Sequence, residues 1–190
     1  MGTFQAPSIR RGVILLACAL LAGCGYGRIQ ELDDRAQAAR SDIEVQLQRT
    51  VDLVPNLIEI VQTYVALDAV LIQALADGRA RLASAVRSDD LRRMEEGAAD
   101  LSGAIRRLLA AAERNSALHS DPVFQLIQAQ LDETENEIDA ACRDYNVAVE
   151  EYNAYLNGFP QSVTAKVIGA QRRESFRVTM PSDASSTEGG

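Results

Sequence analysis

The sequence predicts an all-α fold, an antiparallel up-down bundle of three to four long helices. Ala, Leu, Val, Glu and Arg dominate the 190 residues, aromatic residues make up 5%, and Trp is absent, a composition typical of long helices. Apolar residues recur at three- and four-residue spacing over long stretches, which is the period of an amphipathic helix. Because no low-complexity linker divides these stretches, we expect one helical domain, over residues 29–160.

The first residues predict export and lipidation. Arg10 and Arg11 precede an apolar run over 12–21, the arrangement of a secretory signal peptide. The run ends in four residues that resemble the lipobox of bacterial lipoproteins, in which the cysteine is acylated before cleavage: Leu21, Ala22, Gly23 and Cys24. We therefore expect a signal peptide over 1–23, a lipid anchor on Cys24, and a short tether over 24–28.

Two other interpretations of this segment are weaker. An uncleaved membrane helix needs about 20 apolar residues, more than the run provides. A twin-arginine export signal would place bulky apolar residues after Arg11, where Gly12 and Val13 stand. Acyl chains on Cys24 would hold the protein on the membrane without a transmembrane helix.

The charge of the mature chain excludes one class of partner. The 19 basic residues lose Arg10 and Arg11 with the signal peptide, so 17 remain against 27 acidic residues and the net charge is about −10. Such a surface should repel nucleic acid and anionic lipid headgroups. We expect no nucleic-acid partner.

The first two helical patterns meet at a proline. Apolar residues at helical spacing run from Leu32 to Val54 and again from Ile58 to Val86. Pro55 has no amide hydrogen to donate to the carbonyl of Val51, so we expect the helix to kink or restart there. The two stretches then form one kinked helix or two abutting helices.

Two further helices follow, each with a capping signal. The polar stretch 87–90 predicts a hairpin turn, with Ser88 as the N-cap of a helix over 91–112. After a break at 115–121, Asp121 before Pro122 predicts the start of a helix that ends at Asn157 and Gly158. This last helix would be about 54 Å long at ~1.5 Å per residue. Its apolar residues form one seam at heptad spacing: Phe124, Ile127, Leu131, Thr134, Ile138, Cys142, Tyr145, Val149, Tyr152 and Leu156.

The C-terminal part is too short for another domain. Residues 161–180 mix apolar and basic side chains, and this extension either packs back on the bundle or reaches a partner. Residues 181–190 are Ser, Gly and acidic residues, and we expect them to be disordered.

No residue pattern predicts catalysis. The single histidine, His119, falls in an expected loop without a second nitrogen ligand nearby. The acidic residues between Glu133 and Asp139 alternate along a helix, so they should form a solvated face and not a site. Cys142 lies on the apolar seam, where a structural thiol is the expectation and a redox sensor the alternative. We expect no enzyme, cofactor, metal or small-molecule substrate.

Two segments are candidates for binding another envelope protein. Tyr145 and Asn146 recur seven residues later as Tyr152 and Asn153, so the pairs share a helix face. Core packing of the tyrosines is the alternative. The second candidate lies around Pro55, where Asp52 and Asn56 flank the expected break; a kink with local capping is the alternative there.

Several blocks of the sequence resemble the LemA family of bacterial membrane-associated proteins. They span most of the mature chain in the family's order: Glu44 to Arg49, Asp52 to Leu57, Tyr64, Leu101 to Ala104, Arg107 to Ala110, Glu113, Thr134 to Asn136, Arg143 to Asn146, Ala148 and Val149, Tyr152 and Asn153, and Phe159 and Pro160. The resemblance implies an N-terminal membrane anchor, an antiparallel helical bundle outside the cytoplasm, and no established enzymatic activity.

The chain departs from the family in a few places. Many members look anchored by a transmembrane helix, whereas this sequence has a lipobox-like segment that ends at Cys24. Thr50 replaces a basic residue, and Tyr26 is followed by Gly27 instead of Asn. Ser175 replaces the first ring of an aromatic pair. We expect a non-enzymatic scaffold or interaction module in the envelope, with its domain in the periplasm; a self-associating coiled-coil spacer is the alternative. Gly25 allows sorting to either the inner or the outer membrane.

Overall fold

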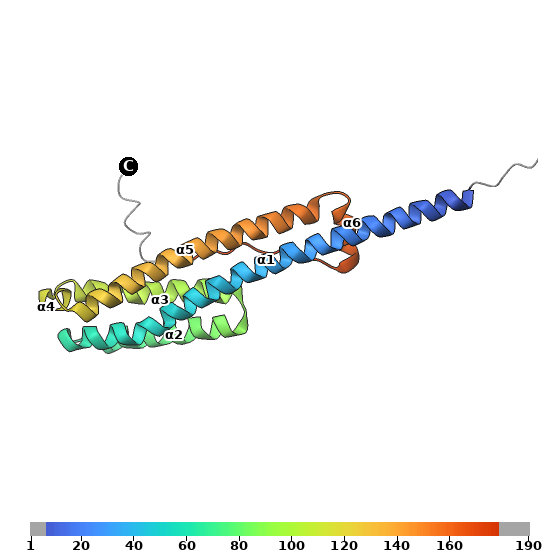
Figure 1. Cartoon of the computed structure of the whole chain (residues 1–190). Helices are drawn as coiled ribbons and strands as arrows, with labels where there is room; N and C mark the ends of the chain where they lie inside the picture. The colour runs from blue at the N-terminus through green and yellow to red at the C-terminus, as the bar shows by residue number, and fades with distance from the viewer. Residues whose placement is uncertain (1–6, 179–190) are drawn as a thin grey trace, which may run out of the picture. The chain divides into compact units, whose positions relative to one another are not determined.

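The computed structural model describes the backbone of residues 7–178 and the side chains of residues 25–178. Six α-helices and no strand occur in this part of the chain, which confirms the all-α fold (Figure 1). The helices are α1 (Pro7–Tyr64), α2 (Ala69–Ser88), α3 (Leu91–Ala112), α4 (Ser116–His119), α5 (Pro122–Asn157) and α6 (Gln161–Ile168). The expected signal-peptide side chains and the tail 181–190 lie outside the described residues.

Of the two outcomes expected at Pro55, the structure rules out the restart and has one helix through the proline; the chain breaks later, before α2. Helix α1 continues through Pro55 and ends at Tyr64, and α2 begins only at Ala69. The real start signal is Asp68, whose side chain accepts a hydrogen bond of 2.9 Å from the amide of Val70. A proline removes one hydrogen bond from a helix, and a tertiary contact described below replaces that bond here.

The hairpin turn between α2 and α3 lies where the sequence predicts it, but its cap is different. Ser88 is the last residue of α2, and Asp90 caps α3 by accepting a hydrogen bond of 3.1 Å from the amide of Arg93. Asp89 adopts the left-handed conformation, with φ 54°, that commonly ends a helix. Arg40 of α1 binds both the backbone carbonyl and the carboxylate of Asp89, which attaches the turn to α1.

The start of α5 is confirmed. Asp121 accepts hydrogen bonds from the amides of Val123 at 2.7 Å and Phe124 at 3.2 Å, and Pro122 is the first helical residue. The preceding break, expected to be a loop, contains α4, a single helical turn capped by Asn115.

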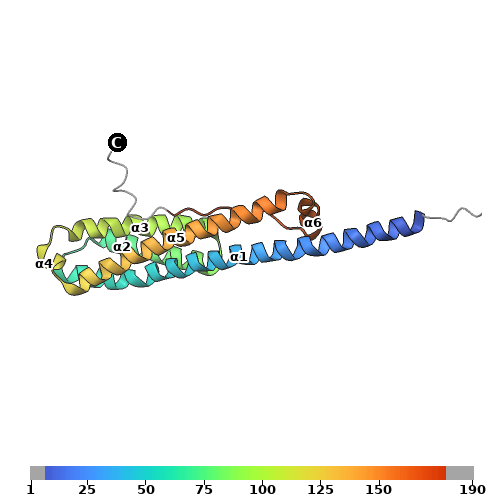
Figure 2. The same ribbon diagram turned by 45° about the horizontal axis from the view of Figure 1, so that its top comes forward.

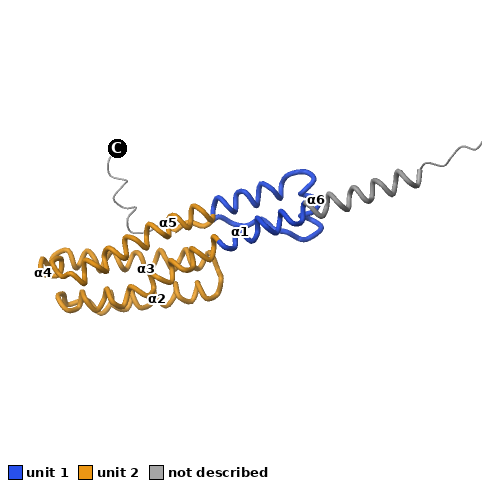
Figure 3. Tube along the Cα trace, viewed as in Figure 1, with its two compact units in different colours: residues 1–38, 146–175 blue, residues 39–145, 176–190 orange. Residues whose placement is uncertain are grey.

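The expected single bundle over 29–160 divides into two compact units, coloured separately in Figure 3. Unit 2, residues 39–145 and 176–190, is a four-helix bundle of α1, α2, α3 and α5, with consecutive helices running in opposite directions (Figures 1 and 2). Its buried side chains are mostly aliphatic, and they include Phe176 from beyond the last helix.

Helices α2 and α3 of unit 2 pack with their backbones unusually close. A Cβ on Gly97 of α3 would lie 3.0 Å from the Cα of Leu82, and a Cβ on Gly78 of α2 would lie 3.1 Å from the Cα of Leu101. The two glycines therefore serve the same purpose from opposite sides of one interface.

Unit 1, residues 1–38 and 146–175, joins part of α1 and part of α5 with α6. Its core consists of Ile29, Leu32, Tyr152, Leu156 and Ala165. The C-terminal extension packs back on these helices, which is one of the two outcomes that the sequence allowed. The expected tether is not a separate segment, because residues 25–28 are helical and continue into the rest of α1.

Candidate functional site

The predicted lipidation site lies at the edge of the described side chains. Cys24 and the lipobox residues Leu21, Ala22 and Gly23 fall within α1, and their side chains lie outside the description. No described helix is long and apolar enough to span a membrane. The next residue, Gly25, is buried, and a Cβ on it would stand 3.4 Å from Oγ1 of Thr164 in α6. Folded structure therefore reaches the residue directly after Cys24.

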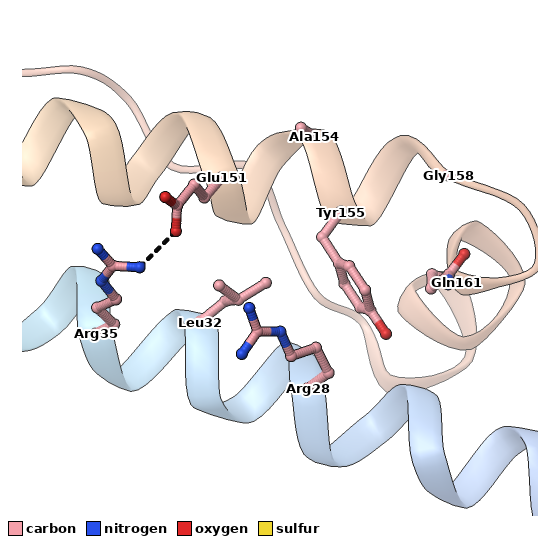
Figure 4. Close-up of a pocket in the computed structure, with 8 residues that line it drawn as sticks. All are labelled: Arg28, Leu32, Arg35, Glu151, Ala154, Tyr155, Gly158 and Gln161. Atoms are coloured by element: carbon pink, nitrogen blue, oxygen red, sulfur yellow. Dashed lines mark hydrogen bonds and ion pairs between the residues drawn. The ribbon is translucent and has the colours of Figure 1, made fainter.

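A groove of about 620 Å³ lies beside this end, between α1 and α5 of unit 1 (Figure 4). Arg28 pairs with Glu31 at 2.5 Å, and Arg35 pairs with Glu151 at 2.6 Å. Each guanidinium therefore already faces a carboxylate, which reduces the positive charge that the groove offers to an anion. The residues that line it are Arg28, Leu32, Arg35, Glu151, Ala154, Tyr155, Gly158 and Gln161.

The candidate segment around Pro55 is held by a contact from another helix. Arg79 of α2 donates a hydrogen bond of 3.0 Å from Nε to the carbonyl of Val51, the group that Pro55 leaves without its helical donor. Sequence reasoning predicted the free carbonyl but not its partner. This contact explains how α1 passes through Pro55 without a break.

A double-mutant cycle tests this explanation. Arg79→Ala should lower the free energy of unfolding by about 1 kcal/mol, because it leaves the carbonyl of Val51 to water. In a Pro55→Ala background the helix supplies its own amide donor, so the same change should cost close to nothing. Urea unfolding of the four proteins measures the coupling. Equal costs of Arg79→Ala in both backgrounds would refute the explanation.

The structure separates the residues of the Pro55 candidate. Asp52, Pro55 and Asn56 are all exposed, and Asp52 accepts a hydrogen bond of 2.9 Å from Gln48 one turn earlier. Only Asn56 borders a groove, of about 420 Å³, between α1 and α5 of unit 2. The α5 side of the groove is mostly apolar and includes Leu126, which is 58% exposed. The lining residues are Asn56, Glu59, Ile60, Thr63, Val123, Leu126, Ile127 and Gln130.

The tyrosine and asparagine pairs do not form an exposed stripe. Tyr145 and Tyr152 are buried, so the core-packing alternative describes them and the partner-binding hypothesis is corrected. Asn153 accepts a hydrogen bond from the amide of Arg173 at 3.0 Å and donates one to its carbonyl at 2.9 Å. Asn146 is half-buried. The heptad seam points inward because the chain supplies its own packing partners.

Asn153 instead organises the C-terminal extension. Besides its backbone bonds to Asn153, Arg173 donates from Nε to Asp33 at 2.8 Å, and its guanidinium lies 5.9 Å from the ring centre of Tyr152. Burial, followed by the charge of Asp33, raises the pKa of Tyr152 above its ordinary value. The extension is thus bound to α1 and α5 by polar contacts within unit 1.

Cys142 is buried, as the structural interpretation predicts. Burial is the main cause that raises the pKa of its thiol to about 12, and the charge of Asp139 adds to it. At neutral pH the group is therefore a thiol and not the reactive thiolate. A redox sensor would need the opposite environment.

The shifted thiol pKa predicts a loss of stability at alkaline pH. The unfolded thiol ionises near pH 9 and the folded thiol only near 12. The folded state therefore holds the proton more tightly, and stability is lost as the pH rises between these values. Cys142→Ala should remove up to ~1.36 kcal/mol per pH unit of this loss, less where solvent screens the group. Urea unfolding of both proteins at pH 7 and pH 10.5 measures how much the free energy of unfolding falls between the two pH values. An equal fall in the native protein and in Cys142→Ala would contradict the prediction.

The acidic residues of α5 do not all form a solvated face. Glu135 is buried, which corrects that expectation, and Glu137 pairs with Arg49 of α1 at 2.6 Å. In a four-helix bundle the buried stripe of a helix is wider than one seam, so Glu135 beside Thr134 falls inside it. Among the described residues no cluster of three or more His, Cys, Asp or Glu could hold a metal ion.

Sequence reasoning missed a polar contact at the end of α1. The hydroxyl of Tyr64 donates a hydrogen bond of 2.6 Å to Asp121, and Asn115 donates one of 3.0 Å to the carbonyl of Tyr64. The hydrogen bond lowers the pKa of Asp121 and raises that of Tyr64. One carboxylate therefore caps α5 and binds the C-terminus of α1. The isolated position of Tyr64 among the family-like blocks was the only signal for it.

Comparison with known proteins then decides the family. The family model described as the LemA family matches residues 39–187. The chain belongs to the LemA family. Many of the blocks that carry the resemblance supply structural contacts, among them Tyr64, Asn153 and the pair formed by Thr134 and Glu135.

This LemA-family protein is also similar to curated magnetosome proteins. Magnetosome proteins MamQ 1 and MamQ 2 of Paramagnetospirillum magneticum (strain ATCC 700264 / AMB-1) are each 25% identical to it, over 80% of this chain and 64% of the relative. Magnetosome protein MamQ of Magnetospirillum gryphiswaldense (strain DSM 6361 / JCM 21280 / NBRC 15271 / MSR-1) is 23% identical over the same shares. The chain thus spans less than two thirds of the length of these relatives.

Proposed function

We propose that this LemA-family protein is a lipid-anchored lipoprotein of the cell envelope, and that its periplasmic helical domain is a non-enzymatic scaffold or protein-interaction module. The proposal rests on the N-terminal segment, where the predicted lipidation site is followed directly by a residue of the folded domain. Four residues that resemble a lipobox end at Cys24, and Gly25 directly after it is already buried against α6. An acylated Cys24 would thus place the folded unit 1 at the membrane surface, in either the inner or the outer membrane.

The interaction role is supported by the groove that Asn56 borders. Its α5 side exposes Val123 and Leu126, and its α1 side carries the polar residues Asn56, Glu59 and Thr63. Exposed apolar side chains bordered by polar ones are typical of a protein-binding surface. Asp52→Ala and Asn56→Ala test this surface. Only Asn56 lines the groove, so only Asn56→Ala should weaken the binding of a partner there. Full retention of folding and of every co-purifying envelope protein in both variants would remove this surface from the proposal.

The alternative is a self-associating coiled-coil spacer that pairs through the seam of α5. All ten seam residues are buried within the chain, so a spacer would need another surface. Sedimentation of the detergent-solubilised protein separates the two. A monomer over a wide concentration range favours the interaction module, and a stable dimer favours the spacer.

The experiment that tests the anchor compares the native protein with Cys24→Ser by intact mass and membrane fractionation. We expect a mature chain that begins at an acylated Cys24, and a variant that keeps residues 1–23 and gains no acyl mass. Density fractionation of the native protein then assigns it to the inner or the outer membrane. An uncleaved, unacylated chain in both samples would overturn the proposal.

A further inference from the structure

Helix α6 and the turn before it expose an unusual number of large apolar side chains. Phe159 is 86% and Val167 81% exposed, and Val163 and Ile168 are exposed as well. Val163 and Val167 lie four residues apart on one face of α6, while Ala165 on the opposite side packs into the core of unit 1. We call Phe159, Val163, Val167 and Ile168 the α6 patch.

The charge around the α6 patch is opposite to that of the whole chain. The sequence carries 27 acidic residues, yet none of them falls between Tyr152 and Arg173. The same stretch contains three basic residues, of which Lys166, within α6, and Arg172, four residues after Ile168, are exposed. Apolar side chains with flanking cations suit the boundary between headgroups and acyl chains of a membrane that contains anionic lipids.

The α6 patch also lies at the end of unit 1 from which the chain continues to its anchor. Gly25 of α1 packs against Thr164, which lies in α6 between Val163 and Ala165. Figures 1 and 2 both show α6 beside this part of α1. Gly25 directly follows Cys24, so a membrane that holds an acylated Cys24 would be within reach of α6.

We propose that the α6 patch enters the interfacial region of the membrane, with Lys166 and Arg172 facing anionic headgroups. The inference rests on the proposed anchor and goes beyond it, because it adds a second contact that sets how unit 1 is oriented on the lipid surface. An acyl chain alone leaves the attached domain free to rotate, whereas two contacts restrict it. The occupant is the bilayer, not a protein, because the cations and the anchor point to lipid.

The absence of Trp from the sequence provides a direct test. Phe159→Trp places one indole in the patch, and Val147→Trp places one on an exposed position of α5, ten residues and about 15 Å before the end of that helix. Each full-length acylated protein is reconstituted in vesicles of phosphatidylcholine and phosphatidylglycerol whose acyl chains carry bromine. We expect strong quenching and a blue-shifted emission for Phe159→Trp, and weak quenching for the control. Equal quenching in the two proteins would overturn the proposal.

Charge reversal tests the headgroup contact. Lys166→Glu with Arg172→Glu, introduced into the Phe159→Trp protein, should lower the population of the inserted state by at least about thirtyfold, because each of the two cations near an anionic surface contributes ~1 kcal/mol and ~1.4 kcal/mol is a factor of ten. Quenching should fall to its level in vesicles of phosphatidylcholine alone. Unchanged quenching would refute the role of the two cations. Thermal unfolding of all variants confirms that unit 1 is intact.

Failure of the α6 patch proposal can be distinguished from failure of the proposed lipid anchor, because different measurements test them. Intact mass reports acylation independently of fluorescence. An unacylated protein with a quenched indole refutes the lipid anchor and supports the patch. An acylated protein whose indole keeps the emission of an aqueous side chain supports the anchor and overturns the patch. A blue-shifted indole without vesicles would reveal a protein contact and would also overturn it.

Discussion

Phe176→Ala should lower the free energy of unfolding by about 3–5 kcal/mol, the usual cost of removing a fully buried phenylalanine ring. Phe176 lies beyond the last helix, but its side chain is completely buried in unit 2. The neighbouring amide of Arg177 donates a hydrogen bond of 2.8 Å to Glu95 of α3. Removing the ring therefore opens a cavity in the bundle. It also weakens the attachment of the segment around Phe176, which would then be held mainly by the hydrogen bond from the amide of Arg177.

Phe159→Ala is the matched control, since it deletes the same ring from an exposed position. Its effect on the free energy of unfolding should stay within about 0.5 kcal/mol. Urea unfolding measures both variants, and proteolysis should cut near residue 170 faster in Phe176→Ala than in the native protein. Similar small effects of the two substitutions would show that Phe176 is not a core residue of the bundle.

Gly97→Ala should destabilise the protein by about 1–3 kcal/mol, although alanine is the better helix former by ~1 kcal/mol. The added Cβ would lie 3.0 Å from the Cα and 3.1 Å from the backbone nitrogen of Leu82. Backbone atoms cannot rotate away as a flexible side chain can, so α2 and α3 must separate. That separation loosens every apolar contact between them.

Gly103→Ala is the control in the same helix, because its nearest atom would be the end of the Arg106 side chain at 3.9 Å. It should stabilise the protein by about 0.5–1 kcal/mol, the helix propensity alone. Gly78→Ala should behave like Gly97→Ala, and the double variant should cost less than their sum because one separation of the helices relieves both clashes. Stabilisation by Gly97→Ala would refute the close approach of the two helices.

The local sequence predicted the helices and several of their ends correctly. Asp121 and Pro122 start α5 as expected, and the ten seam residues of that helix are all buried. Such features depend on the helical period and on contacts within a few residues, so they can be read from the chain. Asp90 shows the limit, since it caps α3 two residues after the expected N-cap, Ser88.

The candidate site was harder to predict, because most of its contacts join residues far apart in the chain. Arg79 reaches the carbonyl of Val51, Tyr64 reaches Asp121, and Asn153 binds the backbone of Arg173. The sequence suggested that Asp52, Asn56 and the tyrosine pairs face a partner. In the structure, Asn56 is the one of these residues that lines the groove between α1 and α5 of unit 2, and both tyrosines are buried.

The sequence by itself determined the all-α class, the helical periods, the LemA resemblance and the expectation of a lipid anchor at Cys24. The tertiary structure alone decided that α1 passes through Pro55, that Glu135 and Phe176 are buried, and that α6 exposes its apolar patch. The physical reason is that a helical pattern shows that a face is apolar but not what covers it. Packing partners distant in the sequence decide which faces become core and which remain exposed.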